Sequence, residues 1–111
     1  MGVLASGRLR EWFAIESPTE TRNEVGELVQ TWAEVARVFG SYDALSYVEL
    51  TRRGQIGGNT SGTVMIRYYP GLQANWRLRW LSRGGRVLYI SGVVEQGFRE
   101  AMELTVEEAS A

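Results

Sequence analysis

The chain has 111 residues, the length of a single domain that buries one hydrophobic core, and we expect residues 1–111 to form one domain. It contains no cysteine, histidine or lysine. Disulfides, cysteine or histidine metal ligands, Ser-His-Asp triads and Schiff-base lysines are therefore excluded. The net charge of −1 disfavours tight nucleic-acid binding, and no apolar run is long enough for a transmembrane helix.

The first part of the chain has apolar residues mostly at a period of two, which indicates β-strands. Residues 12–16 alternate, with Phe13 and Ile15 on one face. The Ser-Pro pair at 17–18 is a turn signal and is predicted to end this strand. The polar stretch 19–27 then predicts a hairpin-like connection.

A long second strand is predicted for residues 28–42. Trp32 and Val35 lie three residues apart, so we expect a bulge or bend near residues 33–34. The alternative is a helix, which the β-branched and aromatic content of the segment disfavours.

Residues 45–50 fit either a short helix or the start of a strand. The following segment, residues 51–62, has four glycines and almost no apolar side chain. Such a segment cannot offset its ordering entropy by burial, so the sequence predicts a long mobile loop over about residues 46–62. Long loops in compact domains are usually functional or disordered.

The remaining apolar segments alternate and predict four more strands, at residues 63–69, 76–80, 86–94 and 99–106. Glycine-containing turns separate them, and the tail 107–111 is predicted to be frayed. The predicted fold class is therefore all-β, a small six-stranded β-barrel or sandwich with one long flexible loop between the second and third strands.

No catalytic residue is predicted, because nothing in the sequence places two of the 13 acidic residues together. The protein is thus expected to be no enzyme and to have no cofactor or metal. Among the four tryptophans, Trp32 and Trp80 are predicted to lie in the core. Trp12 and Trp76 fit either the core or a protein interface, where tryptophan is enriched.

Seven segments appear in an order that is typical of one protein family: residues 7–10, 15–22, 26–40, 45–49, 66–72, 86–90 and 99–104. The tryptophan-containing stretch 31–40 is the most specific of them. Together, over residues 7–106, they resemble the head–tail joining proteins of tailed bacteriophages, also called head-closure or stopper proteins. A relative in a gene transfer agent would have the same sequence features.

The resemblance implies a small β-barrel that forms a hexameric or dodecameric ring at the virion neck. The ring, assembled in the cytoplasm of the host bacterium, would close the DNA-filled head and dock the tail. Its implied partners are copies of itself, a portal-side adaptor protein, and a tail terminator or tail tube protein. No membrane is involved.

The resemblance also implies that the loop 46–62 points into the channel and contacts packaged double-stranded DNA transiently. The channel or gating candidates are Glu49, Arg52, Arg53, Gln55 and Asn59. Arg52 and Arg53 fit equally well a role in keeping an exposed loop soluble.

Six residues are candidates for contacts between subunits: Trp12, Tyr47, Trp76, Arg77, Arg79 and Glu103. Arg77 and Arg79 either pair with acidic residues of a ring neighbour or form the exposed face of an edge strand, which charge protects from aggregation.

Two other functions remain open. The first is a neck or tail-completion protein with the same barrel. The second is an OB- or SH3-like nucleic-acid module, in which Tyr68, Tyr69 and Trp80 would stack on bases. The acidic charge balance disfavours this second function.

Overall fold

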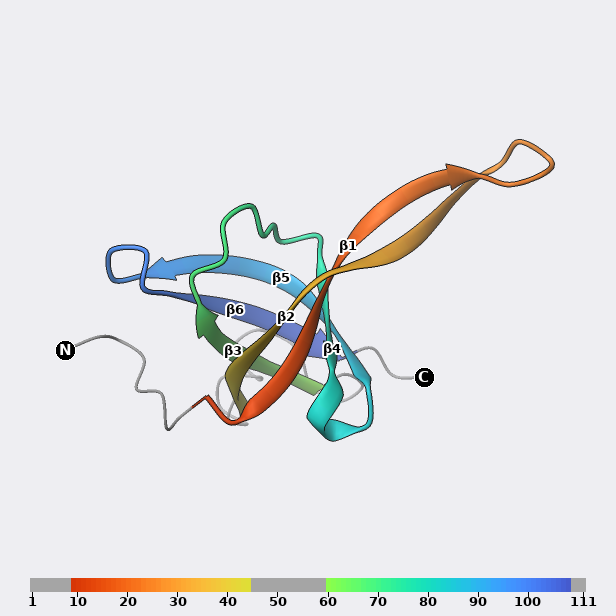
Figure 1. The fold of residues 1–111 in the computed structure, drawn as a ribbon. Helices are drawn as coiled ribbons and strands as arrows, with labels where there is room; N and C mark the ends of the chain where they lie inside the picture. Colours follow the sequence, from red (N-terminus) through yellow and green to blue (C-terminus); the bar gives the residue numbers. More distant parts are fainter. Residues whose placement is uncertain (1–8, 45–59, 109–111) are drawn as a thin grey trace.

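The computed structural model describes residues 9–44 and 60–108, which form six β-strands (Figure 1). They are β1 (Glu11–Arg22), β2 (Leu28–Ala44), β3 (Thr60–Arg67), β4 (Arg77–Trp80), β5 (Arg86–Gln96) and β6 (Ala101–Glu108). A short 3-10 helix, η2 (Leu81–Arg83), follows β4. The all-β prediction with six strands is confirmed, and the helix considered for residues 28–42 is wrong.

All six strands form one antiparallel sheet that closes into a barrel in the order β1-β2-β3-β6-β5-β4. Closure depends on four residue pairs between β1 and β4, from Phe13–Trp80 to Glu16–Arg77. β4 therefore has a neighbour on each side and is not the edge strand that one interpretation of Arg77 and Arg79 required.

The core fills the inside of the barrel with side chains from alternating strand positions. Its largest fully buried members are Phe13, Ile15, Ile66, Leu78, Leu88, Leu104, Val64 and Val106. Phe13 and Ile15, which the sequence places on one face of the first strand, both point into this core. Trp80 is also buried, as predicted, and stacks on Phe13 with ring centroids 5.7 Å apart.

The strands β1 and β2 are longer than the barrel, and their outer halves leave it together as a two-stranded ribbon (Figure 1). β1 pairs with β4 only up to Glu16, and β2 pairs with β3 only from Gly40 onward. We call residues 17–34 the ribbon. It gives the protein an elongated shape, with extents of 53 × 32 × 25 Å.

A β-bulge marks the root of the ribbon. Ile15 pairs with Ala36 and Glu16 pairs with Glu34, so Val35 is an extra residue on β2. The bulge predicted near residues 33–34 is thus present, one residue further along the chain. Bulges bend a strand and increase its twist, which directs the ribbon away from the barrel wall.

The prediction that the first strand ends at the Ser-Pro pair is wrong, because β1 continues to Arg22. Pro18 pairs with Trp32 in the ribbon, where β1 has only one neighbouring strand among the described residues. Proline has no backbone N–H and therefore cannot donate a hydrogen bond to a neighbouring strand, but a strand with one free edge tolerates this loss.

The third strand begins at Thr60, earlier than predicted, because Gly62 belongs to the ladder with β6 and not to a loop. A Cβ atom at position 62 would lie 2.6 Å from the Tyr42 ring, so the close approach of Tyr42 requires a glycine there. At the other end of the ladder, β6 runs to Glu108 and includes part of the segment predicted to fray. Residues 45–59 and 109–111 lie outside the described residues.

Candidate interaction surfaces

The turn at the tip of the ribbon is held by local hydrogen bonds. The Asn23 Oδ1 atom accepts hydrogen bonds from the backbone N–H groups of Val25 (3.1 Å) and Glu27 (2.9 Å). Arg22 donates from its guanidinium to the Gly26 carbonyl oxygen at 2.8 Å, and Gly26 has a φ of 84°, which favours glycine. The turn is therefore ordered although nothing from the barrel packs on it.

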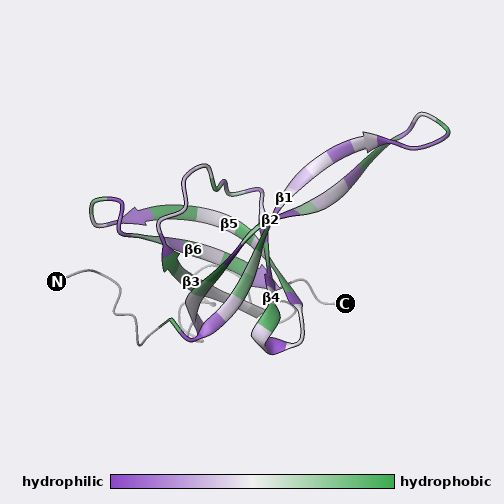
Figure 2. Cartoon of the chain, in the orientation of Figure 1, coloured by the Kyte–Doolittle hydropathy of each residue, from purple (hydrophilic) through white to green (hydrophobic). Residues whose placement is uncertain are grey.

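Hydrophobic and hydrophilic residues follow one another along the ribbon, as the hydropathy colouring of Figure 2 shows. Val25 is 75% exposed and Leu28 is 61% exposed. Three glutamates of the ribbon, Glu20, Glu24 and Glu27, are also exposed. Apolar side chains at the end of a projecting hairpin gain nothing from folding alone, so this surface is a candidate for binding another protein.

The root of the ribbon is held by a buried carboxylate. Glu16 is only 6% exposed, and its two oxygens accept hydrogen bonds from Arg77 Nε (2.6 Å) and Arg79 Nε (3.2 Å). The sequence predicts that these arginines pair with a neighbouring subunit or face solvent. In the structure both bind Glu16 of their own chain, and the pairing ties β4 to the strand that carries the ribbon. Arg79 is still 44% exposed, so a role at the surface remains a prediction for it.

Trp32 lies at this root and not in the core, so its predicted core position is wrong. Its ring is partly exposed. The ring centroids of Trp32 and Tyr89 are 6.1 Å apart in an edge-on arrangement, and the Arg77 guanidinium carbon lies 4.4 Å from the centroid of the Trp32 ring. The bulge at Val35 changes which residues of β2 face the barrel interior, and Trp32 lies beyond it. Here the tryptophan covers the ion pairs of Glu16 through a cation–π contact.

The opposite end of the molecule is formed by the turn between β5 and β6 (Figure 1). Phe98 at this turn is 91% exposed, and Val94 on β5 is also exposed. Arg99 is the one non-glycine with a positive φ, 57°, among the described residues. Arg67, at the end of β3, pairs with Ala101 and so lies beside this turn. We call Arg67, Val94, Phe98 and Arg99 the turn end.

A third exposed apolar area lies on the barrel wall. Trp12 and Phe39 are paired across β1 and β2, and their ring centroids are 4.2 Å apart. Trp12 is half-buried against Phe39, whereas Phe39 itself is exposed. This position is compatible with the predicted interface role of Trp12.

The other predicted interface residues lie in different places. Trp76 packs on the barrel core, and Glu103 accepts a hydrogen bond from Gln96 Nε2 at 3.0 Å. Tyr47 lies outside the described residues. So do all of the predicted channel-loop residues: Glu49, Arg52, Arg53, Gln55 and Asn59. Among the described candidates, Arg77 and Arg79 meet at Glu16, whereas Trp12, Trp76 and Glu103 make other contacts.

Sequence reasoning missed the ribbon, the Glu16 cluster and the turn end. A signal for the ribbon was present, since Thr19, Thr21, Val29 and Thr31 are good strand formers on both sides of the Asn23–Gly26 turn. The Glu16 cluster has no local signal, because Arg77 is 61 residues away.

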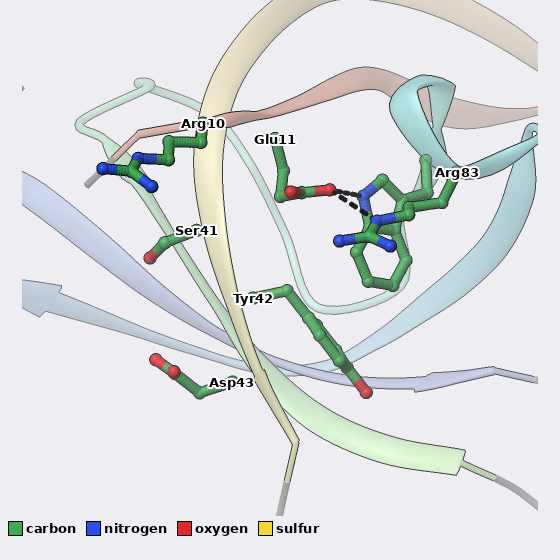
Figure 3. Close-up of a pocket in the computed structure, with 7 residues that line it drawn as sticks. Arg10, Glu11, Ser41, Tyr42, Asp43 and Arg83 are labelled. Atoms are coloured by element: carbon green, nitrogen blue, oxygen red, sulfur yellow. Dashed lines mark hydrogen bonds and ion pairs between the residues drawn. The ribbon is translucent and has the colours of Figure 1, made fainter. Parts of the chain in front are cut away.

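A pocket of about 350 Å³ opens at the barrel end near the start of β1 (Figure 3). Glu11 lies at its side and accepts hydrogen bonds from Trp80 Nε1 (2.6 Å), Ser82 Oγ (3.0 Å) and Arg83 Nε (3.2 Å). The pocket is lined by Arg10, Glu11, Ser41, Tyr42, Asp43, Trp80 and Arg83. Within the described ranges, no group of three acidic side chains could hold a metal ion.

The pKa of Glu11 reflects two opposing effects. Burial raises it, but the hydrogen bonds from Trp80, Arg83 and Ser82, together with the positive charge of Arg83, outweigh burial and lower it below 4.5. A carboxyl with a depressed pKa stabilises the folded state above its unfolded pKa, and this contribution is lost as the pH falls through the folded value.

We therefore expect the loss of thermal stability between about pH 7 and about pH 3 to be smaller in Glu11→Gln than in the natural protein. Melting temperatures followed by circular dichroism measure the difference. The matched control is Glu20→Gln, which removes an exposed carboxylate with no hydrogen bond or ion pair in the described part of the chain. Equal acid sensitivity of Glu11→Gln and the natural protein would refute the role of Glu11.

The solved structures that are similar to the chain include the following two. A solution structure of protein SF1141 from Shigella flexneri 2a has a TM-score of 0.74 and 27% identity, covering 96% of this chain and 98% of that one. A chain in the virion of a native gene transfer agent particle has a TM-score of 0.67 and 17% identity, covering 93% and 96%. No curated protein matches. In the described residues, no helix has the length and apolar character needed to cross a membrane.

A family model described as phage head completion protein matches residues 4–109. The match spans nearly the whole chain and confirms the resemblance to phage head–tail proteins that the order of the sequence segments predicts. A barrel that exposes apolar side chains at two opposite ends fits a protein that associates with other proteins of a particle. The chain therefore belongs to the phage head completion protein family and is a structural virion protein.

Proposed function

We propose that the protein is a subunit of the head–tail connector, forming a ring that closes the DNA-filled head and docks the tail. Family membership supports this proposal, and so does the likeness of its fold to a chain of a gene transfer agent virion. The observation that carries it is the ribbon, which projects from the barrel with Val25 and Leu28 exposed.

A subunit in a cyclic ring needs two different surfaces, because each copy contacts one neighbour on each side. The ribbon and the turn end supply two such surfaces, far apart on the protein (Figure 1). Further surface is required for the proteins above and below the ring, and the area around Trp12 and Phe39 is available for that contact.

The proposed partners are further copies of the chain, in a hexameric or dodecameric ring, a portal-side adaptor and a tail terminator or tail tube protein. The site of action is the virion neck, after assembly in the host cytoplasm. The segment between β2 and β3 is proposed to face the channel and the packaged DNA through Glu49, Arg52, Arg53, Gln55 and Asn59. The role is structural and not enzymatic.

The nucleic-acid module has less support. Its stacking platform requires exposed aromatic rings, but Trp80 is buried, and Tyr68 and Tyr69 are partly buried against the core. A neck or tail-completion protein of the same family is the remaining alternative, and it differs from the main proposal in which partner the ring contacts.

Deletion of the gene from the phage or gene transfer agent that encodes the chain tests the proposal. We expect heads that lack tails and lose their DNA, and we expect the intact gene supplied in trans to restore tailed particles. Cryo-electron microscopy of the restored particles should show a ring of this chain at the neck. Normal tailed particles in the deletion strain would overturn the proposal.

A further inference from the structure

We propose that the ribbon of one subunit binds the turn end of the next copy of the chain, so that these two surfaces form the ring contact. This inference rests on the proposed ring. It goes further by assigning the two surfaces that meet and the side chains that recognise each other.

Both surfaces combine exposed apolar side chains with charges, and the apolar parts match in character. The ribbon presents Val25 and Leu28, and the turn end presents Val94 and Phe98. Phe98 is 91% exposed at the apex of its turn, where it has no function in the core of its own subunit. Large side chains placed in this way are typical of contacts in which they insert into a partner.

The charges of the two surfaces are complementary. The ribbon carries four glutamates and one arginine, and Glu20, Glu24 and Glu27 form no ion pair in the described part of the chain. Arg67 and Arg99 at the turn end likewise form none within the described ranges. Their approach across a subunit boundary would bring opposite charges together and orient the contact.

Three glutamates lie near the turn end, and they do not block this pairing. Glu100, in the turn itself, already interacts with another group of its own chain. Glu95 pairs with Met102, whose side chain is in the core, so Glu95 lies on the other face of the sheet from Val94. Glu103, opposite Val94, already accepts a hydrogen bond from Gln96. Arg67 shares the outer face with Val94, because Ile66 next to it points into the core.

The arrangement of the two surfaces permits head-to-tail association, which a ring requires. They differ from each other and lie at opposite ends of the protein (Figure 1), so each copy can bind one neighbour with its ribbon and another with its turn end. The ribbon extends about 20 Å, from six residues at about 3.3 Å each, which is enough to reach over a neighbouring barrel.

The absence of cysteine from the sequence allows a direct test by disulfide trapping. We expect a variant carrying both Val25→Cys and Phe98→Cys to give a ladder of covalent oligomers, up to the ring, when purified particles are oxidised. Each single variant should give no oligomer larger than a dimer, because a chain with one cysteine cannot be linked on both sides.

Charge reversal gives a second test that depends on pairing. Glu24→Arg or Arg67→Glu alone should lower the incorporation of the chain into particles about tenfold, and the two together should restore it. Both positions are exposed on the subunit surface, and unchanged melting temperatures of the isolated variants show that folding is intact.

The outcomes separate this inference from the proposed function. Rings at the neck without a ladder, or a Val25→Cys link to a different virion protein, would overturn the ribbon contact and leave the ring intact. Particles without any ring of this chain would overturn both.

Discussion

The Glu16→Ala variant should lose about 3 kcal/mol of its free energy of unfolding. The carboxylate is 6% exposed and neutralises Arg77, whose side chain is itself only 15% exposed. Its removal leaves a largely buried guanidinium without its partner in the strand pairing that closes the barrel. Urea denaturation at neutral pH, followed by circular dichroism, measures the difference.

The matched control for Glu16 is Glu34→Ala. Glu34 also binds an arginine, Arg37, at 3.0 Å, but both side chains of that pair are about half exposed. Pairs of this kind contribute at most about 1 kcal/mol, so the control should unfold almost like the natural protein. Similar losses in the two variants would show that burial does not determine the strength of the Glu16 cluster.

The Gly40→Ala variant should lose about 2 kcal/mol, because the added methyl group has no space. A Cβ atom at position 40 would lie 2.8 Å from the Ile66 side chain and 2.8 Å from the Met65 carbonyl oxygen. Ile66 is fully buried and the carbonyl belongs to the neighbouring strand, so neither atom moves away without disturbing the barrel.

Gly92→Ala is the control for Gly40, since both glycines lie in strands without a positive φ. A Cβ atom at position 92 would meet Thr105 at 3.5 Å, an ordinary contact distance. We expect this variant to stay within about 0.5 kcal/mol of the natural protein in the same denaturation experiment. A larger loss for Gly92→Ala than for Gly40→Ala would contradict the packing argument.

The strands were predictable because inward-facing residues alternate along most of them. Met102, Leu104 and Val106 show this plainly, and all three are buried. Local turn signals were less reliable. The Ser-Pro pair at 17–18 is a turn signal when only its neighbours in sequence are considered. At Pro18, however, β1 has lost its neighbour β4 but still pairs with β2, so the strand continues as an edge strand that tolerates proline.

The candidate surfaces were not predictable for a different reason. Glu16 meets Arg77 only because the barrel closes between β1 and β4, and no property of either sequence segment encodes that contact. Tryptophan is a residue type that often lies in a core. The extra residue at Val35 shifts the alternation along β2, so that Trp32 lies at the ribbon root. Phe98 is apolar, but its turn lies beyond the end of the barrel core.

The two rims of the ribbon have unequal capacity for adding a further strand. Along β1, Pro18 removes one backbone donor. The ribbon part of β2, residues 28–34, contains no proline and has no second neighbour among the described residues. Hydrogen bonding of another chain is thus open on one rim and impaired on the other. A proline on an exposed edge of this kind disfavours edge-to-edge aggregation of unassembled subunits.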